Sequence, residues 1–122
     1  MRRSASLFTA NARHSDQMQA LLEIGSLPDN GLDAGVYFTT YYLKAAEDML
    51  GAADENDLAI LLPSASVDHD DWRTALARDL ARKYAPKRVN VVARGSIAAT
   101  EATLAYLRDA PAVTGQYLAA HE

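Results

Sequence analysis

Three side chains that could hold or transform a small molecule each follow a segment with the composition of a buried strand. Ser64 comes after the apolar run Leu58–Leu62, and Arg94 and Ser96 follow the β-branched run Val89–Ala93. The carboxyl ends of parallel strands meet at one edge of a sheet, where ligands bind. We therefore expect a ligand crevice at that edge, in which Ser64 supplies a hydroxyl and Arg94 a charge for an anion.

These residues do not make up a complete catalytic signature. No Gly-x-Ser-x-Gly motif surrounds Ser64, so a hydroxyl at a strand end is its simpler interpretation. His69 stands among Asp68, Asp70 and Asp71, but residues adjacent on a helix do not converge on one ion. We expect this acidic group to be a solvated helix cap, and we predict no metal site.

The segment from Asp68 to Tyr84 is the longest amphipathic helix that the sequence predicts. Its apolar side chains recur at helical spacing, and its basic side chains fall largely outside that stripe. Asp68 is the expected N-cap, and Pro86 cannot continue the helix. The expected inward residues are Trp72, Ala75, Leu76, Leu80 and Tyr84, and the expected exposed ones are Arg73, Arg78, Arg82 and Lys83.

Strands and helices alternate along the second half of the chain, which indicates βαβ units. The apolar run Leu58–Leu62 fits a strand that is buried on both faces of a parallel sheet. We predict a single domain, residues 1–122, with an α/β fold: a small three-layer α/β/α Rossmann-like sandwich around a mostly parallel sheet of about four strands. The expected strands are Ala5–Ala10, Leu58–Leu62, Val89–Ala93 and Tyr117–Ala120, and the expected helices are His14–Ile24, Asp33–Ala53, Asp68–Tyr84 and Thr100–Arg108.

The overall composition argues against several classes of partner. The formal net charge of −4 disfavours a nucleic-acid partner. No stretch approaches the roughly 20 apolar residues of a membrane span, and the apolar run after the first residues is too short for an export signal. The chain contains no cysteine, which excludes disulfides and thiolate metal sites. We expect a cytoplasmic protein with no membrane and no nucleic-acid partner.

Several motifs resemble the second half of the short-chain dehydrogenase/reductase (SDR) family. The family's Leu-Ala-x-Glu-x-Ala-Pro, Arg-Val-Asn, Ala-Pro-Gly and Val-Thr-Gly-Gln motifs have counterparts in the same order and at similar spacing. These counterparts are Leu80–Pro86, Arg88–Asn90, Ala93–Gly95 and Val113–Gln116. Weaker likenesses are Leu7–Arg13 to the strand ending in Asn-Asn-Ala-Gly, Gly35–Phe38 to the start of a long helix, and Ile60–Ser64 to the strand ending at the catalytic serine.

Most residues that this resemblance assigns to chemistry have no counterpart here. The family's first strands and its Thr-Gly-x-x-x-Gly-x-Gly loop, which holds the dinucleotide pyrophosphate, are absent from residues 1–122. The active-site asparagine falls on Leu32, and the nicotinamide-contacting Pro-Gly has become Arg94-Gly95. The Tyr-x-x-x-Lys pair, whose lysine lowers the phenol pKa, falls on Ser66 and Asp70 or, in another register, on Ala77 and Ala81. We therefore predict a pseudoenzyme without catalytic residues, cofactor-binding residues or cofactor, in which only Ser64 matches a catalytic position.

Two functions remain open. The first is a non-catalytic, SDR-like interaction module that forms a homodimer or a larger homo-oligomer. Aromatic side chains anchor interfaces, although a small domain could use the same side chains in its core. The expected interface residues are Tyr37, Tyr41, Trp72 and Leu76. The second function is that of a small-molecule or nucleotide-binding protein, or an enzyme of another kind, using the crevice near Ser64, Arg94 and Ser96.

Overall fold

The structure is a computed structural model that describes residues 18–121. Its elements are β1 (Gln19–Glu23), α1 (Gly31–Tyr41), α2 (Leu43–Leu50), β2 (Asp57–Leu62), the 3₁₀ turn η1 (Val67–His69), α3 (Asp70–Lys83), β3 (Val89–Ala93), α4 (Ile97–Arg108) and β4 (Tyr117–Ala119). The expected strand Ala5–Ala10 and the motif Leu7–Arg13 lie outside the described residues.

The sheet has four strands in the order β1-β2-β3-β4, and each neighbouring pair is parallel. Leu58 pairs with Val89 and Leu62 pairs with Ala93, so β2 and β3 are adjacent parallel strands, as predicted. Every residue of these two strands is buried. A strand that is covered on both faces has no polar side, which explains the unbroken apolar run in β2.

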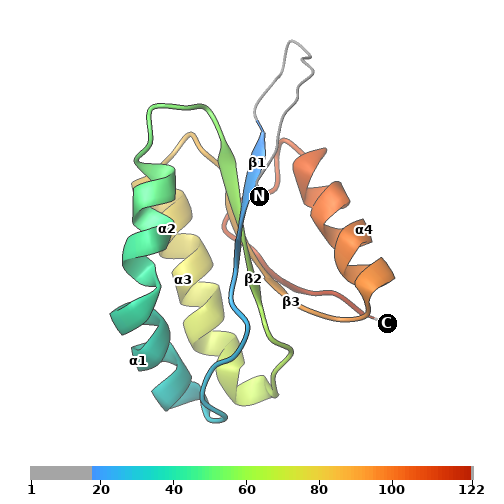
Figure 1. Cartoon of the computed structure of the whole chain (residues 1–122). Coiled ribbons are helices and arrows are strands. Elements are labelled where there is room, and N and C mark those ends of the chain that lie inside the picture. The colour runs from blue at the N-terminus through green and yellow to red at the C-terminus, as the bar shows by residue number, and fades with distance from the viewer. Residues whose placement is uncertain (1–17, 122) are drawn as a thin grey trace.

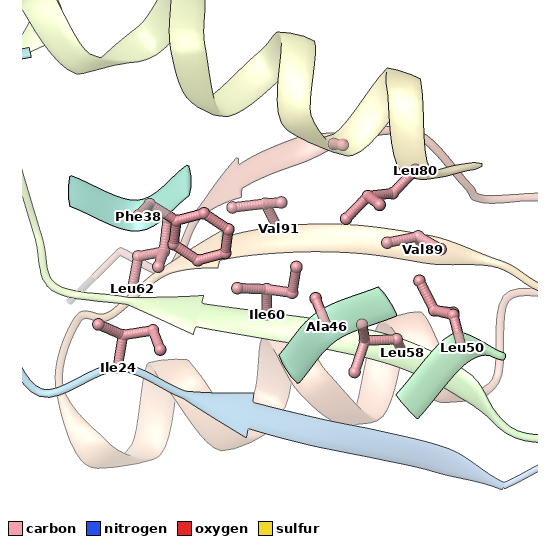
Figure 2. Close-up of a cluster of buried hydrophobic side chains, with 11 residues drawn as sticks. Ile24, Phe38, Ala46, Leu50, Leu58, Ile60, Leu62, Leu80, Val89 and Val91 are labelled. Atoms are coloured by element: carbon pink, nitrogen blue, oxygen red, sulfur yellow. The ribbon is translucent and has the colours of Figure 1, made fainter. Parts of the chain in front are cut away.

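Helices cover both faces of this sheet (Figure 1). α1, α2 and α3 lie on one face and α4 lies on the other, which confirms the three-layer α/β/α sandwich. The larger core lies between the three helices and the sheet; Figure 2 shows Ile60 and Val91 of the strands beside Phe38 of α1. On the opposite face, Leu107 of α4 packs in a smaller cluster with Val92.

The segment predicted as a helix, His14–Ile24, contains the strand β1 instead. Ala20 and Leu22 pack against the larger core, whereas Leu21 between them is 44% exposed, an alternation with the period of a strand. Backbone hydrogen bonds of 2.7 and 2.9 Å flank the strand and tie it to β2. The few apolar residues of this segment fit a helix as well as a strand. The segment forms a strand because its backbone pairs with β2.

The single helix expected over Asp33–Ala53 is divided into α1 and α2, which meet at Tyr42. Tyr42 leaves helical geometry, with φ −126° and ψ −20°. Just before this break, the hydroxyls of Thr39 and Thr40 donate to carbonyls four residues earlier, at 2.9 and 2.8 Å, and such bonds bend helices. The first helix begins after Asn30, whose side chain accepts a backbone hydrogen bond of 2.8 Å from the first turn.

α3 turns most of its predicted apolar stripe inward, because Leu80 is buried and Trp72, Leu76 and Tyr84 pack against the larger core. Its buried side also includes residues outside that stripe. Arg73 and Ala77 are buried, whereas Ala75, expected to face inward, is exposed. Trp72 is only half-buried and packs sideways on α1, with its ring centroid 5.8 Å from that of Phe38. The expected exposure of Arg73 is therefore wrong, because its polar head has partners inside the fold.

A buried ion pair joins three elements at the amino-terminal end of the strands. Asp57, which is 2% exposed, accepts hydrogen bonds from the backbone N and the Nε of Arg88 at 2.7 and 2.8 Å. The Nη atoms of Arg88 donate to the carbonyls of Leu107 and Arg108 at 2.8 and 3.1 Å. The pair therefore links the beginnings of β2 and β3 to the end of α4.

Two of the SDR-like motifs, one at the start of β3 and one before β4, are hydrogen-bonded to each other. The Asn90 side chain donates to the Val113 carbonyl and accepts from the Gln116 N–H, each at 3.0 Å. The residue before Asn90 donates its N–H to the Thr114 hydroxyl at 3.0 Å and accepts from the Gly115 N–H at 2.7 Å. Gly115 has φ 72°, a conformation that favours glycine. These contacts place β4 beside β3.

The remaining elements lie close to their predicted positions. β4 ends at Ala119, one residue before the predicted end of Tyr117–Ala120. α4 begins at Ile97, ahead of the predicted Thr100–Arg108, and ends where predicted. Within residues 18–121, no helix has the length and apolar character needed to cross a bilayer.

Candidate functional site

Ser64 and Arg94 line one open cleft of about 640 Å³ at the carboxyl ends of β2, β3 and β4. Its other polar lining residues are Asp70, Thr74, Tyr117 and His121. The parallel strands bring the two predicted residues together although thirty positions of sequence separate them. This juxtaposition follows from the strand-end rule that motivated the expectation.

Ser96, the third residue expected in the crevice, does not line this cleft. Its hydroxyl accepts a hydrogen bond of 3.0 Å from the backbone N–H of Ala99 and caps the amino end of α4. This cap also explains why α4 starts earlier than predicted. Within residues 18–121, the Ser96 side chain therefore has a structural partner in the helix that it precedes.

The guanidinium of Arg94 contacts two residues at the end of β1. Its Nη2 lies 3.1 Å from a carboxylate oxygen of Glu23 and 3.3 Å from the carbonyl oxygen of Ile24. Arg94 thus reaches from the end of β3 across β2 to the end of β1. The Glu23 side chain is 58% exposed, so solvent screens this ion pair and its contribution to stability is small.

The most deeply buried charged side chain at this end of the sheet is Arg73, which is 1% exposed. Its Nη1 donates to the carbonyl of Pro63 at 2.8 Å and to the hydroxyl of Tyr117 at 3.1 Å. The guanidinium also lies 5.3 Å from the ring centroid of Trp72 and 5.7 Å from that of Tyr117. Nε is buried and has no hydrogen-bond partner among the described residues.

His69 is buried, with 3% exposure, so the expectation that it is solvated is wrong, whereas Asp68, Asp70 and Asp71 are exposed as expected. Its Nε2 lies 2.7 Å from the carbonyl oxygen of Asp29, which can only accept, so Nε2 carries the proton. Its Nδ1 accepts from the indole N–H of Trp72 at 3.2 Å. The imidazole therefore links the loop before α1 to the first turn of α3.

Asp68 does not cap α3 with its side chain, because His69 stands at that position without a side-chain cap bond. The Asp68 carboxylate instead accepts hydrogen bonds from the Ser66 hydroxyl and, at 2.8 Å, from the Gly31 N–H. These donors, the hydroxyl first, lower the pKa of Asp68 below its usual value. A Cβ on Gly31 would collide with the Asp68 carbonyl, so glycine permits this close approach.

A second, smaller cavity of about 230 Å³ adjoins the cleft, since Ser64 and Ala65 line both. It lies between the loop that follows β1 and the loop that follows β2. Its other polar lining residues are Asp29, Ser66, His69 and Arg73. Sequence reasoning missed Arg73 and His69; the available signal was that Arg73 is four residues before Ala77 and seven before Leu80, on one side of the helix.

A groove of about 420 Å³ runs between α1 and α3. Trp72 and Leu76, two of the expected interface residues, line it together with the exposed side chains of Leu32 and Val36. The other two expected residues, Tyr37 and Tyr41, are also exposed on α1, with ring centroids 4.6 Å apart. We call these side chains the apolar face: Leu32, Val36, Tyr37, Tyr41, Trp72 and Leu76.

The positions that align with the family's Tyr and Lys lie in different surroundings. Asp70 lies on the wall of the cleft and Ala77 is buried under α3. The tyrosine that reaches the cleft is Tyr117, whose hydroxyl accepts from Arg73. Among residues 18–121, no cluster of three or more His, Cys, Asp or Glu side chains is placed to hold a metal ion.

Comparison with known proteins identifies one family. The family model named SDR-like, described as short chain dehydrogenase-like protein, matches residues 22–120. No curated protein and no solved structure matches the chain.

Proposed function

Since the chain belongs to the SDR-like family of short chain dehydrogenase-like proteins, we propose that it is a non-catalytic member that assembles with a second copy of itself. The contact is formed by the apolar face on α1 and α3. The observation that carries this proposal is the exposure of large apolar side chains beside the groove: Leu32 is 80% exposed, Val36 60% and Tyr41 64%. Contiguous exposed apolar surface of this kind marks interaction sites.

The chemistry of the apolar face favours a second copy as its occupant. From Leu32 to Tyr42 the only charged residue is Asp33, so the α1 part of this surface carries little charge to repel a second copy. In a two-fold dimer the same patch lies on both sides of the contact, which allows the Tyr37–Tyr41 ridge to lie against the groove of the partner. The SDR resemblance points the same way, because members of that family pack helix pairs into a four-helix contact.

The residues at the family's reactive positions support a non-catalytic role. Ser64 matches the catalytic serine, but serine, aspartate or alanine occupies the positions of the Tyr and Lys. Without that pair, the proton transfer that accompanies hydride transfer has no donor at the required place. Ser64 then remains as an exposed hydroxyl on the wall of the cleft.

Analytical ultracentrifugation of the wild type and two matched variants tests the self-association. Val36→Glu places an unpaired carboxylate in the contact and is expected to weaken association by about tenfold or more. Ile97→Glu makes the same change at a residue that is 81% exposed on α4, across the sheet, and should leave association unchanged. Trp72→Ala should lower both stability and association.

A wild-type sedimentation coefficient of a single chain up to about 100 µM, a concentration well above the dissociation constants of specific complexes, would refute the proposal. Equal effects of Val36→Glu and Ile97→Glu would show that the copies meet through a different surface. Loss of stability without loss of association in Trp72→Ala would place Trp72 in the core alone.

The shared cleft of Ser64 and Arg94 favours a second candidate function, binding of a small molecule. Its volume of about 640 Å³ lies within the 300–1,000 Å³ range that is typical of ligand sites. Thermal-shift measurements with a panel of nucleotides and small metabolite classes test it. Stabilisation by one class that disappears in Ser64→Trp, a variant that fills the cleft, would support this function.

A further inference from the structure

Arg73 has a charge that the described part of the protein does not neutralise. The side chain is 1% exposed, yet none of the ion pairs within residues 18–121 includes it. A buried cation without a counter-ion is strongly disfavoured unless other polar groups replace the water that it loses. The contacts of Arg73 supply only part of that replacement.

The unsatisfied part of Arg73 is one edge of its guanidinium. Both of its hydrogen bonds, to Pro63 and Tyr117, start from Nη1. Nε is buried without a partner, and Nη2 donates no hydrogen bond within residues 18–121. Nε and Nη2 point their N–H groups in parallel, which is the fork that binds the two oxygens of a carboxylate.

Arg73 also lines the smaller cavity, which offers space for a ligand. Arg73 lines that cavity of about 230 Å³ with the hydroxyl-bearing residues Ser64 and Ser66. Its volume falls below the roughly 300 Å³ of a drug-sized site, so it suits a small ligand. Because Ser64 also lines the larger cleft, the non-polar part of a longer ligand has room to extend there.

We infer that the smaller cavity binds a small monocarboxylate, whose two oxygens accept from Nε and Nη2 of Arg73. This inference rests on the second candidate function and is independent of self-association. Asp29 lines this cavity, and Asp70 lines the adjoining cleft. These acids repel a phosphate dianion twice as strongly as a carboxylate, since Coulomb energy scales with charge.

A purely structural role for Arg73 is the competing explanation. Its bonds to Pro63 and Tyr117 tie the end of β2 to β4, which accounts for Nη1. The rings of Trp72 and Tyr117 stabilise the cation from its faces. Neither contact provides a hydrogen-bond acceptor for Nε, so the experiment must examine the Nε edge.

The test is an NMR titration of the ¹⁵N-labelled full chain with sodium acetate, with sodium chloride at equal ionic strength as the reference. We expect a saturable shift of the Arg73 Nε–H signal and of the backbone amides of residues 63–69, with a midpoint on the order of 1–10 mM. Sodium phosphate at the same concentration should shift these signals less. Arg73→Lys, which retains the charge and lacks the fork, should abolish saturation; the wild-type backbone shifts decide the question if this variant does not fold.

Arg94→Gln is the matched control, because Arg94 is the other arginine at this end of the sheet and lines only the larger cleft. It should leave the acetate midpoint unchanged. A midpoint that depends on Arg94 and not on Arg73 would refute carboxylate binding by Arg73. It would still support the binding of a small molecule in the larger cleft. Shifts that are linear in acetate or equal to those in chloride would overturn both, and a stronger response to phosphate would overturn the choice of a monocarboxylate.

Discussion

The Asp57–Arg88 pair at the amino-terminal end of the strands allows a prediction with a defined magnitude. Asp57→Asn removes the negative charge but leaves an amide oxygen. This oxygen can still accept from the Arg88 backbone N–H, which lies 2.7 Å from Asp57 Oδ1 in the wild type. The charged hydrogen bond of 2.8 Å to Nε is lost, and the Arg88 side chain, 12% exposed, keeps an uncompensated charge. Removing one partner of a buried pair costs about 3–5 kcal/mol.

We expect the lower end of that range, because Arg88 retains its bonds to the carbonyls of Leu107 and Arg108. A loss of about 3 kcal/mol is a large part of the roughly 5–15 kcal/mol that stabilises a typical domain. It corresponds to a fall in the melting temperature of roughly 10–15 °C for a chain of this size.

Urea unfolding followed by the fluorescence of Trp72, the single tryptophan of the chain, measures this loss. Asp48→Asn is the matched control: its partner Lys44 is four residues away at 3.1 Å, and the two side chains are 65% and 87% exposed. This exposed pair should contribute less than about 0.5 kcal/mol. Both variants are compared with the wild type at one protein concentration, because self-association would make stability depend on concentration. A cost below about 1 kcal/mol for Asp57→Asn, or one equal to the control, would refute the reasoning.

Three further predictions concern a close backbone contact, a hydrogen-bonded carboxylate and dinucleotide binding. Gly31→Ala should destabilise the protein because the added Cβ meets the Asp68 carbonyl, whereas Gly25→Ala, where nothing lies within 4 Å, should not; thermal melts of both variants check this. The hydrogen bonds from Lys83 and Tyr84 lower the pKa of Glu47, so its stabilising contribution is present above the unfolded value near 4.5 and is lost as the pH falls through the folded value; the difference in melting temperature between the wild type and Glu47→Gln should therefore shrink in acid. Isothermal calorimetry with NAD(H) and NADP(H) should give no tight binding, and a low-micromolar dissociation constant for either would contradict the pseudoenzyme proposal.

Strands β2 and β3 could be predicted from the sequence because burial on both faces leaves a strong apolar signal. β1 could not, since its alternation is short and Leu21 and Leu22 also fit a helical stripe. The break at Tyr42 was hidden for a similar reason: the apolar period continues through it, and only the threonine side-chain bonds of the preceding turn mark the bend.

At the candidate site, the meeting of Ser64 and Arg94 could be predicted because it depends only on strand direction. The roles of Arg73 and His69 could not be predicted, because polar side chains are expected on the protein surface. Their partners are the Tyr117 hydroxyl and the Asp29 carbonyl, which lie 44 and 40 positions away in the sequence. A buried polar residue becomes recognisable only when the groups that satisfy it are known.

The hydrogen bonds between Asn90 and the segment Val113–Gln116 bear on what the SDR signature means in this chain. Two of the motifs of that signature, Arg88–Asn90 and Val113–Gln116, hold β4 against β3. A change in either motif leaves buried donors and acceptors of the other motif unmatched, so the two are coupled through architecture. Their presence is therefore a mark of ancestry in the scaffold, and it is equally compatible with an active and an inactive protein.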